Sequence, residues 1–108
     1  MRRVVVTGMG VISPVGNDLE SFWNNLTEGK NGVGMITRFD TTEQKVKVAA
    51  EVKDFEPTKY IEKSQVRKTD LFAQYALAAA VQAMEDAGLK SGENIDAERL
   101  GVYVGSGT

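Results

Sequence analysis

Few side chains in this sequence could carry out chemistry, because its 108 residues include neither cysteine nor histidine. Thiolate nucleophiles, imidazole bases and the usual zinc ligands are therefore excluded within it. A covalent mechanism would have to use serine, threonine, lysine or a carboxylate. Ser106 stands between two glycines, but the Gly-x-Ser-x-Gly pattern of a nucleophile elbow is not met. We interpret the acidic residues Glu85, Asp86, Asp96 and Glu98 as solvated charges.

Gly8 and Gly10 follow a run of three valines, as in the first turn of a dinucleotide-binding fold. That fingerprint needs a third glycine where Ser13 and Pro14 stand, and a helix that opens directly from the turn. Helix signals begin only at Asn17, so a dinucleotide site is disfavoured. We expect no cofactor and no metal in this chain. The glycines would instead let the backbone pass close to another segment.

A group of basic residues precedes the longest apolar stretch of the chain. Lys59, Lys63 and Arg67 recur at intervals of four, Lys68 stands beside them, and Glu62 opposes them. If this stretch is one continuous helix, the three spaced cations share a face. The pattern leaves two interpretations open, a solvated face and a dock for an acidic partner.

Composition narrows the class of protein. The hydrophobic share of 42% and the charged share of 26% are ordinary for a globular domain. A net charge of −2 argues against nucleic acid as the main partner, because phosphate binding needs a basic field. No apolar run approaches the roughly 20 residues that span a bilayer. We therefore expect a cytoplasmic protein with no nucleic-acid or membrane partner.

Two apolar runs predict interior strands of an α/β sheet, since an unbroken run is typical of a strand covered on both faces. They are residues 4–6, which open the chain, and residues 100–104. Residues 44–53 alternate between apolar and polar side chains, which predicts a half-exposed strand. Because the sequence stops just after its last predicted strand, we expect an interrupted protein.

Two longer helices are predicted. The first covers about residues 18–28, with Asn17 as its N-cap and Trp23 as a packing residue. The second covers about residues 70–87 and ends before Gly88. Its many alanines and the absence of charge from residue 71 to residue 84 predict a helix buried nearly all round.

Several segments in order resemble a known family: residues 3–17, 22–23, 36–40, 66–70, 74–76 and 99–107. They are similar to the β-ketoacyl-acyl-carrier-protein synthases, most closely the type II elongation enzymes of bacterial fatty-acid synthesis. The resemblance implies a thiolase-like layered fold of two similar α/β halves in a homodimer. Residues 1–108 would be an incomplete N-terminal portion of that domain, part of its first half, with a mixed sheet and an alanine-rich buried helix.

The activity implied by the resemblance is a decarboxylative Claisen condensation of acyl chains with malonyl-acyl-carrier-protein. In the family pattern the catalytic cysteine and two histidines lie beyond position 108. The implication is that this chain holds no catalytic residue and is inactive in condensation by itself. The implied partners are acyl carrier protein and the acyl and malonyl thioester substrates.

Two sets of site residues also follow from the resemblance. It implies that Lys63, Arg67 and Lys68 dock the acidic carrier protein, and that Thr108 lines the end of the acyl pocket near the dimer interface. Two alternatives stay open: a non-catalytic member of the fold, such as a chain-length factor, and a stand-alone module that binds carrier protein.

Overall fold

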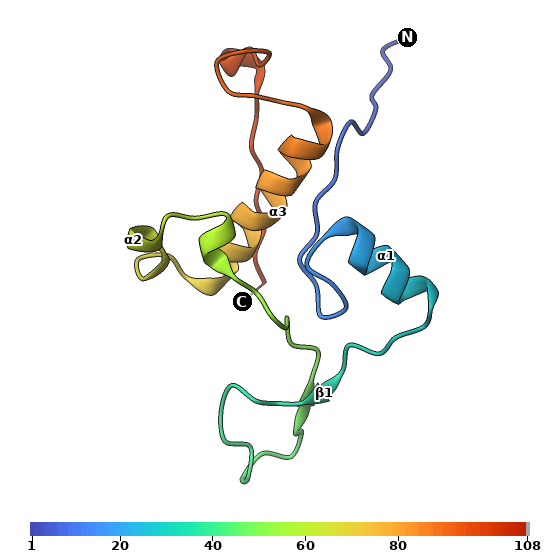
Figure 1. Ribbon diagram of the computed structural model, residues 1–108, viewed down its shortest axis with the longest axis vertical. Helices are drawn as coiled ribbons and strands as arrows, with labels where there is room; N and C mark the ends of the chain where they lie inside the picture. The colour runs from blue at the N-terminus through green and yellow to red at the C-terminus, as the bar shows by residue number, and fades with distance from the viewer. Residues whose placement is uncertain (108) are drawn as a thin grey trace. The chain divides into compact units, whose positions relative to one another are not determined.

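A computed structural model describes residues 1–107, and Figure 1 shows its ribbon. The chain forms two compact units. The first unit contains Met1–Val11 together with the chain from Glu56 onward, and the second is Ile12–Phe55. Among the described residues, no helix combines the length and the apolar character needed to cross a membrane.

The longest element is helix α3, Leu71–Ala87, in the first unit. Alanine has the highest helix propensity of all residues, and the sequence of this helix is rich in it. The helix ends where Gly88 turns to a left-handed backbone with φ of 70°, and its amide donates to the carbonyls of Glu85 and Met84. The predicted span of 70–87 is therefore confirmed to within one residue.

The burial predicted for this helix is wrong in part. Among the described residues only Ala78 and Gln74 are buried, whereas Leu71, Phe72 and Leu77 are 41–56% exposed. The apolar pattern indicates a helix that can be covered all round, but covering it needs partners on every side. In the described chain, the segments that contact α3 leave much of its surface open.

One of those segments is residues 8–11, which pass directly over α3. A Cβ on Gly8 would lie 2.5 Å from the nitrogen of Ala87, and one on Gly10 would lie 2.8 Å from the nitrogen of Ala83. Real Cβ atoms do not approach backbone this closely, so both positions require glycine. The expectation of a close backbone approach is confirmed, and the segment being approached is a helix of the same chain.

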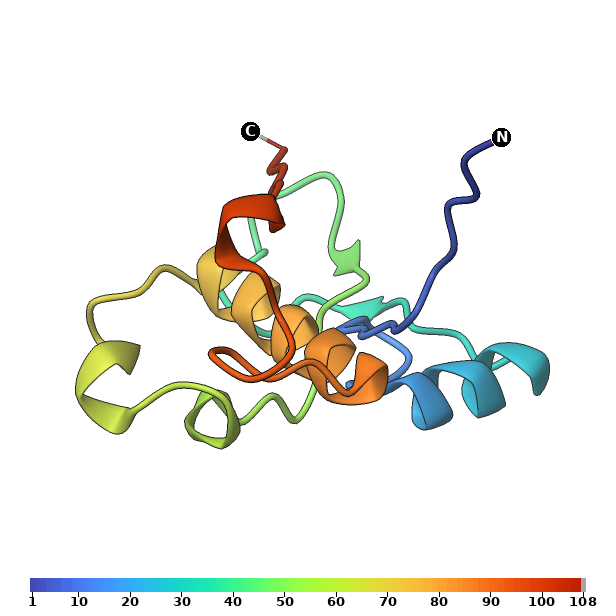
Figure 2. The ribbon, with the colours of Figure 1, turned by 90° about the horizontal axis from the view of Figure 1, so that it is seen from above.

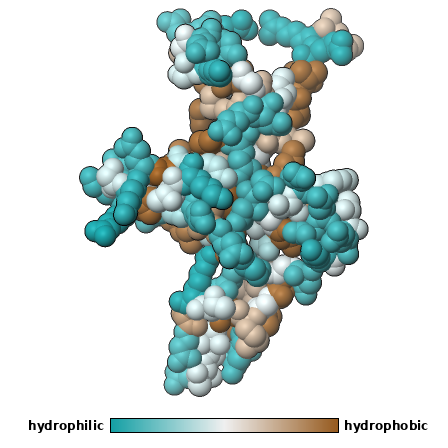
Figure 3. All heavy atoms as spheres, viewed as in Figure 1, coloured by the Kyte–Doolittle hydropathy of each residue, from teal (hydrophilic) through white to brown (hydrophobic). Residues whose placement is uncertain are grey.

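The two predicted interior strands are not formed. Val4, Val5 and Val6 are 65–97% exposed, residues 102–104 are 66–97% exposed, and neither run pairs with another strand. A strand needs hydrogen-bonding neighbours on its edges and cover on its faces, and the described residues supply neither. Residues 1–107 therefore do not form the predicted mixed sheet, and their strands make only one antiparallel pair. Figure 3 shows hydrophobic residues at the molecular surface along the start of the chain.

Helix α1, Leu19–Thr27, belongs to the second unit. Its N-cap is Asp18, whose carboxylate accepts a hydrogen bond of 2.7 Å from the amide of Ser21. The predicted cap, Asn17, instead donates from its side chain to the carbonyl of Lys53 at 2.6 Å. Trp23 was expected to pack but is 60% exposed, because α1 presents that side chain to solvent.

A short antiparallel pair completes the regular structure of the second unit. Strand β1, Gly34–Met35, pairs with β2, Val48–Ala49, in the register Gly34↔Ala49 and Met35↔Val48. A further bond of 2.9 Å from the amide of Ile36 to the carbonyl of Lys47 extends the pairing. The strand predicted over 44–53 is therefore correct in place but much shorter, since only this part meets a partner.

Lys53 ties three loops of the second unit together. Its ammonium group donates to the carbonyls of Pro14 at 3.3 Å, Gly32 at 3.0 Å and Glu51 at 3.0 Å. An ammonium has three donors, and each here has its own backbone acceptor. The loop after residue 13, the start of β1 and the end of the hairpin are thereby held around one side chain.

Candidate functional site

The candidate site is the stretch from residue 57 to residue 69, here called the basic segment. It contains the 3-10 turn η1, Pro57–Lys59, and the single helical turn α2, Lys63–Val66. Figure 2 shows the two turns as separate elements, both earlier in the chain than α3. The continuous helix considered for this stretch is therefore wrong, because the chain leaves the helical path between the two turns.

The break changes how the cations are arranged. Lys59 belongs to η1, where its ammonium lies 3.9 Å from the carboxylate of Glu56, and both side chains are exposed. Lys63, Arg67 and Lys68 lie in or directly after α2, are exposed, and form no ion pair within the described part of the chain. The three proposed docking residues thus form a compact group without Lys59. Figure 3 shows mainly hydrophilic residues on the outer side of the part that carries α2.

Two glutamines of α3 hold the basic segment and residues 8–11 in place. Gln82 accepts a hydrogen bond of 3.1 Å from the amide of Val11 and donates at 3.0 Å to the hydroxyl of Tyr60. Gln74 donates from its side-chain amide to the carbonyls of Val66 at 3.1 Å and Thr69 at 2.9 Å. The helix therefore contacts two earlier segments of the chain, residues 8–11 and the basic segment, through polar side chains of a largely apolar helix.

Reasoning from the sequence did not find these two glutamines. The available signal was their polarity, since glutamine is mostly exposed in proteins and here interrupts a run of apolar residues. A third residue was found but interpreted incompletely: Asp86 is exposed, as expected of a solvated charge, yet its carboxylate also accepts a 2.9 Å bond from the amide of Met9.

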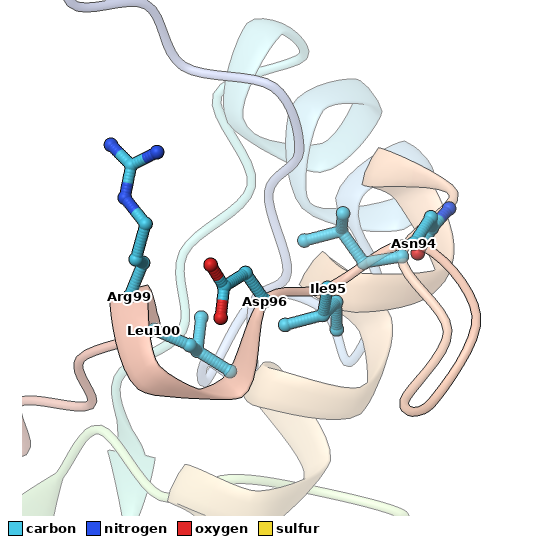
Figure 4. A pocket seen from close by; sticks show the side chains of 6 residues that line it. Asn94, Ile95, Asp96, Arg99 and Leu100 are labelled. Carbon is cyan, nitrogen blue, oxygen red and sulfur yellow. The ribbon is translucent and has the colours of Figure 1, made fainter.

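An open depression of about 250 Å³ lies around the 3-10 turn η2, Ala97–Arg99. Asp96 accepts a bond of 3.2 Å from the amide of Glu98 and so acts as the cap of this turn. Figure 4 shows the side chain of Arg99 extending away from the other labelled residues. Asp96 is the only carboxylate among the lining residues, so the depression offers no pair of acid and base. The lining residues are Leu89, Asn94, Ile95, Asp96, Arg99 and Leu100.

A second depression, of about 340 Å³, lies beside the β1–β2 pair in the other unit and includes Arg38 and Glu51. The Nε of Arg38 stands 3.8 Å from a carboxylate oxygen of Glu51. Burial acts to raise the pKa of Glu51, but hydrogen bonds from Thr37 and the charge of Arg38 outweigh it and hold the pKa below 4.5. These contacts join the residues that follow β1 to a residue that follows β2.

The closing residues add little chemistry. The hydroxyl of Ser106 donates at 3.4 Å to the carbonyl of Gly107 and is exposed. Thr108, expected to line an acyl pocket, lies outside the described residues. Residues 1–107 contain no group of three acidic, histidine or cysteine side chains placed to hold a metal.

Comparison with known proteins gives consistent matches over the whole chain. The family model described as "Beta-ketoacyl synthase, N-terminal domain" matches residues 1–108. The 3-oxoacyl-[acyl-carrier-protein] synthase 2 of Vibrio harveyi is 52% identical over 106 residues, and that of Coxiella burnetii is 49% identical over the same length. Each match covers 98% of this chain and 25% of the relative, so the chain spans about a quarter of their length.

A solved structure shares the fold. The structure described as "The ishigamide ketosynthase/chain length factor" superposes with a TM-score of 0.76 at 45% sequence identity. The superposition covers 82% of this chain and 22% of that one. Over the superposed part, the backbone of this chain therefore follows the path of the matched structure.

Proposed function

Because this chain belongs to the β-ketoacyl synthase family, we propose that it is the N-terminal part of a 3-oxoacyl-acyl-carrier-protein synthase of fatty-acid elongation. The supporting observation is that relatives with that name match essentially the whole chain, and about half of the aligned residues are identical. The complete enzyme would condense an acyl chain with malonyl-acyl-carrier-protein, with loss of carbon dioxide. We further propose a cytoplasmic homodimer.

The fold proposed for the complete protein is the layered thiolase-like one. Residues 4–6 and 100–104 would then be interior strands whose neighbours come from the rest of the protein. Their continuous apolar character and their present exposure both support this assignment. Helix α3 would be covered on the faces that are now open.

In this proposal the chemistry lies outside the present residues. The nucleophile and the groups that activate the malonyl donor must come from elsewhere, because this chain has no cysteine and no histidine. The role proposed for Thr108 is to line the end of the acyl pocket. The 108-residue chain alone is expected to show no condensation activity.

The role proposed for the basic segment is to dock acyl carrier protein through Lys63, Arg67 and Lys68. Four basic residues and one acidic residue lie between positions 59 and 68, although the chain as a whole carries a net charge of −2. A local positive group on an otherwise acidic molecule attracts an acidic partner to that one place. Such attraction accelerates encounter and weakens as salt increases.

The second candidate is a non-catalytic partner of a ketosynthase. It is favoured by the matched solved structure, whose name joins a chain length factor with a ketosynthase. The two candidates differ in whether the complete protein has a nucleophilic cysteine. Release of carbon dioxide from malonyl-acyl-carrier-protein by the purified complete protein, and condensation with an acyl donor, would support the enzyme. The absence of both from the purified complete protein, with condensation appearing only when a ketosynthase partner is added, would support the chain length factor.

Docking is tested separately by reversing charge. Arg67→Glu with Lys68→Glu in the complete enzyme should raise the KM for acyl carrier protein about tenfold at low salt, as expected for lost electrostatic steering. The matched control reverses Lys45 and Lys47, which are also exposed but lie in the other unit, and should leave that KM unchanged. Equal kinetics for both pairs of substitutions at low salt would remove the docking assignment.

A further inference from the structure

Gln74 is the only buried polar side chain among residues 1–107, at 8% exposure. It lies in the first turn of α3, where its backbone amide donates to the carbonyl of Asp70 at 3.0 Å. Burying a side-chain amide is unfavourable unless its donors are satisfied. The NH₂ group donates to two carbonyls, and both belong to the basic segment. The buried side chain of Gln74 is therefore satisfied by the segment that carries the proposed docking residues.

The two acceptors stand on either side of the proposed docking pair. The carbonyl of Val66 comes directly before Arg67, and the carbonyl of Thr69 comes directly after Lys68. One side-chain amide of α3 therefore holds both ends of the dipeptide that carries the two cations. These bonds reach back eight and five positions along the chain, so they bridge the turn between α2 and α3.

The backbone held in this way has little intrinsic stability. Helix α2 has four residues, and a single isolated turn does not offset its nucleation cost in water. The last carbonyls of any helix also lack partners within it. Local bonds close part of the turn, from the hydroxyl of Thr69 to the carbonyl of Gln65 at 2.7 Å and from the amide of Lys68 to the same carbonyl at 3.0 Å. Gln74 supplies the link to a longer element.

We propose that Gln74 is a positioning residue that sets the backbone of Arg67 and Lys68 for an acidic protein partner. The inference rests on the proposed docking function and adds a residue that does not itself touch the partner. A cation on a fixed backbone loses less conformational entropy on binding than one on a mobile loop. Gln74 therefore strengthens docking by keeping the two cations at a constant place relative to α3.

The test uses the complete enzyme and compares two forms of one substrate. The acyl group is offered on acyl carrier protein, which is proposed to dock through the basic segment, and on pantetheine, which carries no acidic protein surface to dock. Gln74→Met keeps the length and volume of the side chain and removes both donors. It should raise the KM for the protein-borne acyl group about fivefold, the loss expected when about one net hydrogen bond is removed. The kcat and KM for the pantetheine thioester should stay as in the wild type.

Two further variants separate positioning from general damage. Gln74→Asn keeps the amide but draws it back by one carbon, and should produce the same KM change even if Gln74→Met folds poorly. Gln44→Leu changes an exposed glutamine in the other unit, outside the proposed docking site, and should leave the KM for the carrier protein unchanged. A KM that increases equally for both substrates in the Gln74 variants, or for neither, would overturn the proposal.

A double-mutant cycle distinguishes this inference from the docking proposal itself. If Gln74 acts through the cations, Gln74→Met should add nothing to the KM of an enzyme that already carries Arg67→Ala and Lys68→Ala. Additive effects would contradict the inference and leave docking intact. If the two alanine substitutions alone do not alter the KM for carrier protein, both the docking proposal and the role of Gln74 are refuted.

Discussion

Replacing Gly10 by alanine tests the contact that organises the first unit. The added Cβ would lie 2.6 Å from the Cβ of Gln82 and 2.8 Å from the backbone nitrogen of Ala83, and would also overlap the carbonyl oxygen of Ala79. Most of these atoms belong to the backbone of α3 and cannot rotate away. Either residues 8–11 must move off the helix, or the contact must be strained.

The size of the effect follows from the bonds at that contact. Contacts between non-bonded carbon atoms are favourable near 3.5–4.0 Å, so the segment would have to withdraw by roughly 1 Å. The bonds from the amide of Val11 to Gln82 at 3.1 Å and from that of Met9 to Asp86 at 2.9 Å would then exceed hydrogen-bonding range. Losing both costs about 2 kcal/mol, and staying in place would store about 1–3 kcal/mol of packing strain. Either route lowers the free energy of unfolding by about 2 kcal/mol.

The assay is urea unfolding of the chain followed by far-ultraviolet circular dichroism, which reports mainly on α3. Hydrogen exchange at the amides of Met9 and Val11 gives a second, local measure, and both amides should lose protection. Gly34→Ala is the control, because a Cβ there meets nothing within 4 Å. Unchanged unfolding and unchanged amide protection in Gly10→Ala would refute the argument from close approach.

Two further predictions concern the second unit. Lys53→Met should lower the free energy of unfolding by about 1 kcal/mol, a modest figure because the side chain of Lys53 is exposed. Thermal unfolding measures this change, and the control Lys45→Met should leave the free energy of unfolding unaltered. The folded-state pKa of Glu51 is held below its ordinary value of 4.5, so its contribution to stability is present above pH 4.5 and is lost as the pH falls through the lower folded value. An NMR titration of the Glu51 carboxyl should give a midpoint below 4.5, and Thr37→Val should raise that midpoint. A midpoint that the substitution does not change would show that the hydroxyl of Thr37 is not what lowers the pKa.

The helices were the most predictable part of the fold. Their signals are local, such as the alanine run of α3 and the left-handed glycine that ends it, and such signals act between residues a few positions apart. The N-cap of α1 was misplaced by one position, since asparagine and aspartate cap about equally well. The side chain of Asn17 was free to serve elsewhere, and its bond to the carbonyl of Lys53 lies 36 positions away.

The strands were predicted less well, for a different reason. The apolar runs at 4–6 and 100–104 indicate strands that are covered on both faces, but a strand exists only when its neighbours are present. Within the described chain these runs stay exposed and unpaired, and the whole chain matches only a quarter of the length of its relatives. The pattern thus describes an environment that these residues by themselves do not provide.

The candidate site was likewise predictable in its local features and unpredictable in its long-range contacts. The identity of Lys63, Arg67 and Lys68 and the local excess of positive charge can be read directly from the residues, because charge is a property of side-chain type. The break between η1 and α2, and the hold of Gln74 on both sides of Arg67 and Lys68, could not be read in this way. They depend on where α3 lies relative to the basic segment, and the bond from Val11 to Gln82 spans 71 positions of the chain. Hydrogen bonds over such separations form only when packing brings the partners together, so they are determined by the tertiary fold.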